Sequence, residues 1–533
     1  MKGQRKHEKH CPQCAESEAL SRRQLMRTAA SGFLAGVPLL APFLSCARPG
    51  SQDPKSADFE KTDGGADDGE KKFLFVFGAM GGASINDSFL AVRQSATPDG
   101  KGLTLNVFPD SIVSEMVDVD PRIRLRAVDL EMEMIGPLEY PAKGRQSSFL
   151  RKYGNEIAVM TVSGTTVSHP VGQYRSVTGN DVWNGRTLQE AVAVQYGKGL
   201  LLPNVNMATL GFGENGKDPS LPSWAQAHAV QDTRYFPFSL HGHKGVEGAP
   251  DEALINIARK VRDEKLDPNS YFMKTFGSSP MIKKWLEYRS GVQEIERMNL
   301  IGRLTILKDD DDTPFTRFGV IPNGRGETYR KIFPNLDMDP LQRQALLAYL
   351  LVTEGLSVSV TMALNMNVSV DRKEDEGRLL TNTPTSFDYS HNAHRATQAL
   401  LWERILDTMD RLITLLKGTE YKNGKSYWDH SMIYIATEFG RDKTRERGLS
   451  DFPSGHHTNN GVTIVSPLIN GGRVYGGIDT NTLETYGCDL NTGDPMPGHH
   501  NGMQDVYASI LQSMNVDTSG SGLPSAKALS RKA

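Results

Sequence analysis

Five short runs of apolar residues, separated by long polar segments, set the pattern of this chain. Each run is rich in β-branched, aromatic or other large apolar residues and is bounded by polar, turn-forming residues, which is typical of buried strands. The runs are residues 73–77, 157–162, 356–360, 432–436 and 462–465. Because strands of a parallel sheet are buried on both faces, such runs predict an α/β fold with a mostly parallel central sheet.

A different periodicity, that of a helix, occupies residues 395–417. Its apolar residues recur at intervals of three or four: Leu401, Ile405, Met409, Leu412 and Leu416. A second helical pattern begins at residue 343 and leads into the run at 356–360, and residues 181–307 indicate helices and long loops. We therefore expect helices to flank the sheet and long insertions to interrupt it.

The first 46 residues have the layout of a twin-arginine export signal. Arg22 and Arg23 precede a mildly apolar stretch, residues 29–44, which glycines and prolines interrupt. This stretch is too short and too weakly hydrophobic to predict a lasting membrane span. We expect the twin-arginine translocation machinery to export the chain to the periplasm or cell envelope.

Cys46 closes a segment that loosely resembles a bacterial lipobox. Two alternatives remain open at this point of the chain. Either a lipid is attached at Cys46 and anchors the protein to the membrane, or the signal is cleaved nearby in the ordinary way.

Composition and charge divide the rest of the chain. Residues 47–72 have few large apolar side chains and predict a disordered linker. The sequence predicts a folded domain over residues 73–518 and a flexible tail over residues 519–533.

The 60 Lys and Arg nearly balance the 63 Asp and Glu, so nothing favours nucleic acid as a partner. With four cysteines, two of them before the export motif, the exported chain has no disulfide framework.

Polar residues follow or precede the predicted strands where a ligand would bind. Asp87 follows the first strand after a glycine-rich turn, Glu438 follows residues 432–436, and His456 and His457 precede the last strand. Carboxylates and imidazoles together suit a Zn or Mn ion. The alternatives are that Asp87 caps a helix and that Glu438 pairs with a nearby arginine.

Asp388, His391 and His394 form the densest local group of metal-like ligands. Residues 391 and 394 are three apart and therefore share one face at the start of a helix. A capped helix with polar histidines is the competing interpretation.

The loop after residues 157–162 is rich in hydroxyl groups and ends in a histidine. Thr165, Ser168 and His169 are its candidate catalytic residues. A hydroxyl at a helix N-terminus can act as a nucleophile where the helix dipole favours an anion. The alternative is that these are ordinary polar residues of a loop, without a catalytic role.

The order of these candidate segments along the chain resembles that of the alkaline phosphatase superfamily. It resembles more closely the exported bacterial family known as domain of unknown function 1501. The most specific block is residues 438–441, Glu-Phe-Gly-Arg, whereas the middle of the chain matches poorly. The resemblance implies a divalent metal ion (Zn, Mn, Mg or Ca) held by these residues: Asp87, Asp388, His391, Glu438 and His457. A hydroxyl beside the metal would then attack an anionic ester.

Two departures from the superfamily qualify this expectation. Phe439 stands where superfamily phosphatases have a histidine, which weakens or removes a second metal site. The hydroxyl-rich loop has no cysteine to become the formylglycine of a sulfatase. We expect a metal-dependent hydrolase of phosphate or sulfate esters, and the alternative is a non-catalytic envelope protein that kept the fold.

Overall fold

The computed structural model describes most of the chain. The described residues are 69–98, 101–132, 140–164, 166–208, 211–240, 250–283, 285–286, 289, 298–310, 313–318, 320, 324–364, 386–445 and 449–531. The predicted export signal, Cys46, most of the predicted linker and Thr165 lie outside them. No helix in the described ranges is both long and apolar enough to cross a membrane.

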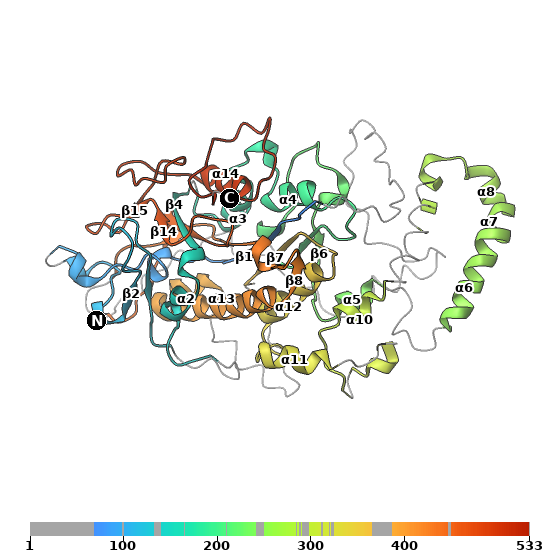
Figure 1. Cartoon of the computed structure of the whole chain (residues 1–533), viewed down its shortest axis with the longest axis horizontal. Coiled ribbons are helices and arrows are strands. Elements are labelled where there is room, and N and C mark those ends of the chain that lie inside the picture. Colours follow the sequence, from blue (N-terminus) through green and yellow to red (C-terminus); the bar gives the residue numbers. More distant parts are fainter. Residues whose placement is uncertain are drawn as a thin grey trace, which may run out of the picture. The chain divides into compact units, whose positions relative to one another are not determined.

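Residues 62–533 form one compact unit around an eight-stranded mixed sheet (Figure 1). The strands lie in the order β14-β4-β13-β10-β1-β7-β5-β6. Their bounds are β1 Phe73–Gly78, β4 Ile157–Ser163, β5 Asn204–Asn206, β6 His228–Ala229, β7 Ser359–Ala363, β10 Ser431–Ala436, β13 Asn459–Val465 and β14 Arg473–Tyr475. Neighbouring strands are parallel, except that β13 runs antiparallel to both β10 and β4. The predicted α/β fold with a mostly parallel sheet is confirmed.

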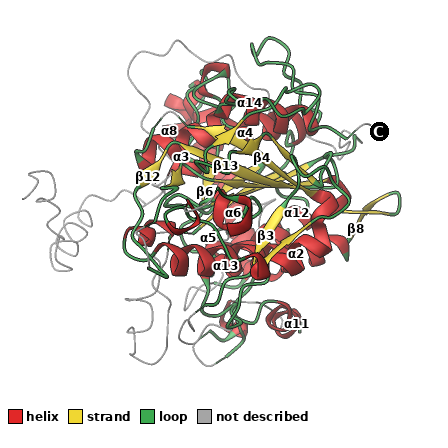
Figure 2. Cartoon of the chain, turned by 90° about the vertical axis from the view of Figure 1, so that its left-hand side faces the viewer, coloured by secondary structure: helices red, strands yellow, loops and turns green. Residues whose placement is uncertain are grey.

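Helices cover both faces of this sheet (Figure 2). One face carries α3 (His169–Thr178), α4 (Leu188–Tyr196) and α14 (Met503–Ser513), and the other carries α2 (Gln146–Tyr153), α12 (Pro340–Thr353) and α13 (His394–Lys417). The apolar residues whose spacing predicted α13 are all buried. Burial of that apolar face, rather than helix propensity alone, stabilises α13.

Shorter elements complete the unit. The remaining helices are α5 Phe236–Ser239, α6 Glu252–Val261, α7 Asp267–Asn269, α8 Tyr271–Phe276, α10 Leu300–Leu304 and α11 Arg325–Ile332. The remaining strands are β2 Val113–Glu115, β3 Arg126–Val128, β8 Glu420–Lys422, β9 Lys425–Ser426, β11 Gly440–Arg441, β12 His456–His457, β15 Gly477–Ile478 and β16 Thr485–Tyr486. Near the C-terminus Leu529 is buried and its carbonyl accepts a hydrogen bond from Asn470 N, so the last described residues pack on the domain.

The sheet differs from the sequence-based expectation at one side. β5 and β6 lie in the region for which the sequence predicted only helices and loops. The sequence did not predict these two strands, because they are only two or three residues long and lack an apolar run. The strand expected at 356–360 begins three residues later, at Ser359. Ser357 Oγ instead donates to the carbonyl of Leu202, 2.5 Å away, and holds the chain in a loop before β7.

The reversed direction of β13 determines which segments meet at the functional edge. Asn459, the first residue of β13, pairs with Ser163, the last residue of β4. The segments that follow β1, β4 and β10 therefore share an edge with the segment that precedes β13. Side chains far apart in sequence meet there.

Candidate metal centre

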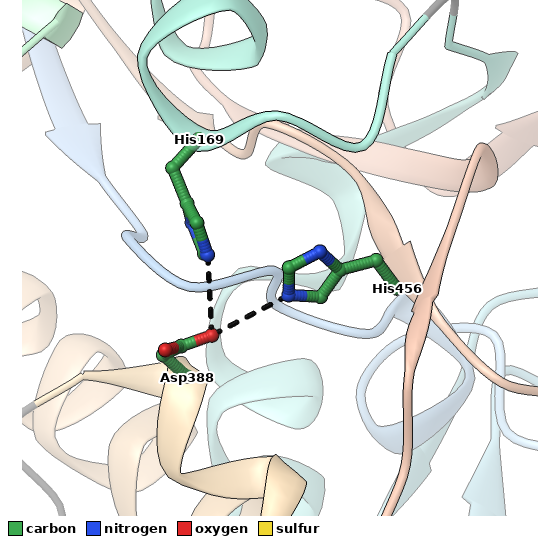
Figure 3. Close-up of side chains that lie close together, drawn as sticks. All are labelled: His169, Asp388 and His456. Atoms are coloured by element: carbon green, nitrogen blue, oxygen red, sulfur yellow. Dashed lines mark hydrogen bonds and ion pairs between the residues drawn. The ribbon is translucent and has the colours of Figure 1, made fainter. Parts of the chain in front are cut away.

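Three ligand side chains from three different segments converge at this edge (Figure 3). His169 is the first residue of α3, directly after the loop that leaves β4. Asp388 lies in a short 3-10 helix, Phe387–His391, and His456 lies in β12. Their ligand atoms all lie within 4.8 Å of one another, and the three residues are half-buried. Such a group can hold a metal ion.

Asp388 Oδ1 is the common point of the cluster. It lies 3.3 Å from His169 Nε2, 3.5 Å from His456 Nε2 and 3.4 Å from His391 Nε2. His391 Nε2 also lies 2.8 Å from His456 Nε2. Three imidazole nitrogens thus face one carboxylate oxygen.

The distances from Asp388 Oδ1 match those between neighbouring ligands of a tetrahedral ion, whereas His391 Nε2 and His456 Nε2 lie closer together than two such ligands. Zinc bound at about 2.0–2.2 Å by nitrogen and oxygen ligands places neighbouring ligand atoms roughly 3.3–3.5 Å apart, the edge of the tetrahedron. The distances from Asp388 Oδ1 to the three imidazoles lie in this range. His169, Asp388 and His456 could supply three ligands, and the side chain of His391, the most exposed of the four, lies 3.4 Å from Asp388 Oδ1.

Three of the four side chains, Asp388, His391 and His456, are held in the protonation state that a metal ligand needs. Burial opposes ionisation of Asp388, but hydrogen bonds and positive charge from His169 and Arg441 outweigh it and hold the pKa of Asp388 well below its usual range. Burial, followed by the positive charge of Arg441, lowers the pKa of both His391 and His456. A carboxylate and neutral imidazoles are the protonation states that a metal requires.

Glu438 reaches the opposite side of the His169 ring. Its Oε1 lies 2.5 Å from His169 Nδ1 and accepts a hydrogen bond from Gly81 N at 2.8 Å. A carboxylate on the second nitrogen of a ligating histidine sets the tautomer and orients the ring. In this geometry Glu438 positions a ligand.

His169 is the basic member of the cluster. Hydrogen bonds to Asp388 and then to Glu438 raise the pKa of His169 to about 9 against the opposing effect of burial. The folded pKa therefore lies above the unfolded value of 6.5. In the metal-free protein this group contributes stability that is complete below about pH 6.5 and is lost as the pH rises through about 9.

Metal affinity should rise steeply with pH, because the proton on His169 must leave before a metal binds. We expect the apparent affinity for a divalent ion to increase about tenfold per pH unit up to about pH 9, the pKa of His169. Competition with a chromophoric chelator from pH 6.5 to 9 measures this. Glu438→Gln removes one cause of the raised pKa, so its plateau should begin at lower pH, and a wild-type plateau at pH 7 would contradict the assignment.

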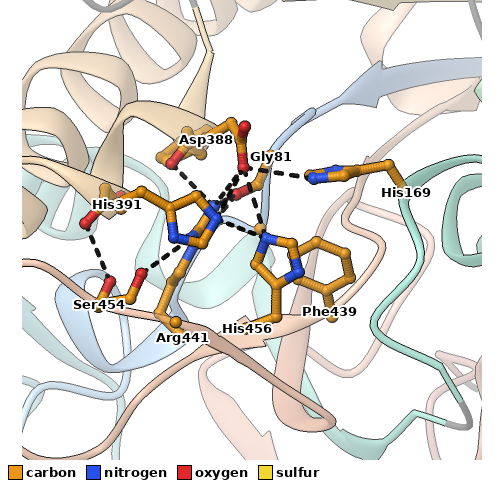
Figure 4. Close-up of polar contacts among 12 residues, drawn as sticks. Gly81, His169, Asp388, His391, Phe439, Arg441, Ser454 and His456 are labelled. Atoms are coloured by element: carbon orange, nitrogen blue, oxygen red, sulfur yellow. Dashed lines mark hydrogen bonds and ion pairs between the residues drawn. The ribbon is translucent and has the colours of Figure 1, made fainter. Parts of the chain in front are cut away.

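Arg441 supports the cluster from below (Figure 4). The side chain is completely buried. Its guanidinium donates to the carbonyls of Gly81, Phe387 and Ser454 and to Asp388 Oδ1, the last at 3.1 Å. Arg441 therefore ties together the turn after β1, the segment carrying Asp388 and the loop carrying His456.

The close approach of two backbones needs a glycine at residue 81. Gly81 has a φ of +96°, and a Cβ there would lie 2.1 Å from the backbone nitrogen of Asp388. Only glycine takes this conformation and this contact without strain. The glycine-rich turn thus sets the position of Asp388.

Phe439 packs against the cluster. Its ring stacks on His456 with centroids 4.1 Å apart and contacts His169 edge-on at 5.0 Å. These contacts restrict both imidazoles, and the Phe439 side chain offers no ligand atom of its own.

Asp87 lies in a separate buried network behind the cluster. Its Oδ2 is 2.9 Å from His394 Nε2 and accepts a hydrogen bond from Asn106 Nδ2, and His394 Nδ1 is 2.7 Å from Ser454 Oγ. Burial opposes ionisation of Asp87, but His394 and a hydrogen bond from Ser84 lower its pKa. The structure thus groups Asp87 with His394, and Asp388 with His169 and His456.

His457 faces away from its neighbour. Successive residues of a strand point to opposite sides. His456 turns toward Asp388, whereas His457 Nδ1 accepts a hydrogen bond from Asn459 N and its pKa is lowered by burial and by the charge of Lys443. Of the two histidines, the structure brings His456 to the cluster.

The hydroxyl-rich loop borders the cluster. His456 Nδ1 lies 3.0 Å from the carbonyl of Val167, and Ser168 is the N-cap residue of α3, exposed and without a side-chain capping bond. Thr165 lies outside the described residues. Ser168 therefore stands next to His169 at a helix N-terminus.

Sequence reasoning passed over two residues of this site. His456 was visible as half of a histidine pair, and strand alternation before β13 was the signal that one of the pair must turn away. Arg441 stood in the specific block 438–441, but its bonds run to three distant carbonyls, which no local pattern reports.

Known proteins add little to this geometry. No family model matches the chain, and no curated protein sequence matches it. Among solved structures the chain is similar to Ps i-CgsB, with 8% identity, 86% of this chain and 75% of that chain covered, and a TM-score of 0.29. A likeness this weak carries no argument about the site, so the functional conclusion depends on the residues themselves.

Proposed function

We propose that the protein is an exported, alkaline-phosphatase-like hydrolase that binds a divalent metal through His169, Asp388 and His456 and cleaves a phosphate or sulfate ester. The observation that carries this proposal is the convergence of the three side chains, whose ligand atoms all lie within 4.8 Å of one another. Bound there, a divalent metal supplies Lewis-acid polarisation of the ester oxygen. The resemblance to the superfamily, stated from the sequence, is consistent with this chemistry.

The residues around the ligands suit an anionic substrate. The N-terminus of α3 has no side-chain cap and carries the positive end of the helix dipole, which favours a phosphate or sulfate group, although Pro170 removes one backbone N–H there. Ser168, the exposed N-cap residue of α3, is the nucleophile we assign. Its oxygen forms a bond to phosphorus or sulfur while the bond to the alcohol oxygen breaks, and the serine proton goes to the leaving alcohol. Water then hydrolyses the seryl ester, which releases phosphate or sulfate and restores the Ser168 hydroxyl.

Metal content and ester hydrolysis of the wild-type protein test this function together. Protein purified from its native export route should contain about one equivalent of Zn or Mn, and it should hydrolyse an aryl phosphate or an aryl sulfate. A chelator should abolish the activity and the metal should restore it. Ser168→Ala should retain the metal and lose activity. A protein that takes up no divalent metal and cleaves neither ester would sink the proposal.

A second candidate function, a non-catalytic envelope protein with a structural ion, is favoured by Phe439. This ring stacks on His456 and offers no ligand atom, whereas superfamily phosphatases have a histidine at this place in the sequence. The two candidates differ in one result. A structural ion would survive in both wild type and Ser168→Ala, with ester hydrolysis in neither.

Export is part of the proposal and has its own test. The paired arginines are what the twin-arginine machinery recognises. Arg22→Lys together with Arg23→Lys should leave the precursor in the cytoplasm, as fractionation and immunoblotting would show. Cys46→Ala should release the exported protein from membranes if a lipid is attached there. Undiminished export of the Lys variant would refute the assignment.

A further inference from the structure

The described part of residues 252–289 is an amphipathic segment in which many apolar side chains are exposed. The segment contains α6, α7 and α8, which follow one another in the chain (Figure 1). Leu254, Ile257 and Val261 are spaced to share one face of α6 and are 57%, 60% and 41% exposed. A helix of a soluble domain normally buries such a face, so this face calls for a partner.

Aromatic and aliphatic side chains continue the exposed surface beyond α6. All of the following are exposed: Leu266, Tyr271, Phe272, Phe276, Met281 and Trp285. Tyr and Trp, with an apolar ring and a polar group, are enriched where lipid meets water. This composition resembles that of helices that lie flat in a membrane interface.

The charge of the segment identifies the partner more closely. Residues 252–289 contain eight Lys and Arg against five Asp and Glu, a net charge of +3, within a chain whose net charge is −3. The rest of the chain therefore carries −6. Two of the acidic residues, Asp263 and Asp267, are paired with Arg289 inside the segment. A basic, apolar surface on an acidic protein complements an anionic one.

A second copy of the chain fits this surface less well. Two copies would bring two segments of net charge +3 together, and like charges repel. An anionic lipid surface attracts the basic residues and accepts the apolar ones at the same time.

We propose that residues 252–289 dock the protein on a bilayer containing anionic phospholipid. The apolar face of α6 and the aromatic residues after it enter the interface, and Lys and Arg contact the lipid headgroups. This places the domain at a membrane surface irrespective of lipid attachment at Cys46.

Fluorescence of Trp285 tests the docking directly in the full-length protein. Vesicles of brominated phosphatidylcholine with phosphatidylglycerol should quench Trp285, and vesicles without phosphatidylglycerol should bind on the order of a hundredfold more weakly at low salt. The Trp285→Phe variant gives the fluorescence of the other four tryptophans, and subtracting it from the wild-type signal isolates Trp285. This readout separates the segment from the apolar stretch 29–44, which could bind vesicles independently.

Matched variants identify the apolar face. Leu254→Asp with Ile257→Asp should weaken the Trp285-dependent binding on the order of a hundredfold. Val117→Asp, at an apolar residue that is 71% exposed elsewhere, should leave it unchanged. All variants should keep their metal, because none touches the cluster.

Two results would overturn the docking. One is the absence of Trp285-dependent quenching by vesicles containing phosphatidylglycerol. The other is a wild-type dimer in sedimentation velocity that the Leu254 and Ile257 substitutions convert to a monomer, which would assign the face to a second copy.

Discussion

Replacing His456 by alanine should abolish divalent-metal binding at the cluster, whereas replacing His457 should not. His456 Nε2 lies 3.5 Å from Asp388 Oδ1 and belongs to the ligand cluster, while His457 turns to the other side of β12. Loss of an outer partner of a metal site typically weakens binding 10–100-fold. Loss of a direct ligand should exceed this, so we expect at least a hundredfold weaker binding for His456→Ala.

Titration of both variants against a chelator of known affinity measures the difference. The two substitutions remove the same side chain from adjacent residues, so any general effect on β12 appears in both. Ester hydrolysis should fall with metal occupancy in His456→Ala and persist in His457→Ala. Equal metal affinity in the two variants would show that His456 is not a ligand.

The largest loss of stability should come from Arg441→Met. The Arg441 guanidinium is fully buried, pairs with Asp388 and donates to three backbone carbonyls. Methionine keeps much of the volume but leaves those three carbonyls without this donor, while Asp388 keeps His169 as a partner. A buried polar group left without a hydrogen bond costs about 1–3 kcal/mol, so the free energy of unfolding should fall by about 3 kcal/mol or more.

Arg445→Met is the matched control. Arg445 lies four residues later, is half-buried, and donates at 2.7 Å to the carbonyl of Gly102. Its loss should cost about 1 kcal/mol, the net contribution of an ordinary hydrogen bond. Urea unfolding of both variants, followed by circular dichroism, compares them. A similar small loss in both would mean that water replaces the Arg441 bonds and that the guanidinium does not hold the site together.

Local patterns predicted the elements of this fold well. The apolar runs at 73–77 and 432–436 became β1 and β10, and the helical spacing over 395–417 became α13. In each case the physical signal is local, because burial on two faces or on one helical face dictates which neighbouring residues are apolar. β5, Asn-Val-Asn, carries no such signal and is defined by its pairing with β7 and β6.

Local sequence patterns predicted the candidate metal site less well than they predicted the fold. Asp388, Glu438 and His169 were all named as candidates, but their roles differ with their neighbours. Glu438 is 269 positions from His169 in sequence, yet its carboxylate contacts His169 Nδ1, the ring nitrogen that does not face Asp388. This contact orients the ring. Sequence spacing carries no information about such a contact.

By itself, the sequence determined the fold class, the strands that end near the site and the residue types able to bind a metal. Only the tertiary structure decided which of them meet. The antiparallel direction of β13 brings its N-terminal end to the edge where β4 ends, and strand alternation then selects His456 over His457. The same arrangement places Asp87 with His394 in the buried interior. Strand order, strand direction and the side to which each residue turns are properties of the assembled sheet, because they depend on pairings between segments hundreds of residues apart.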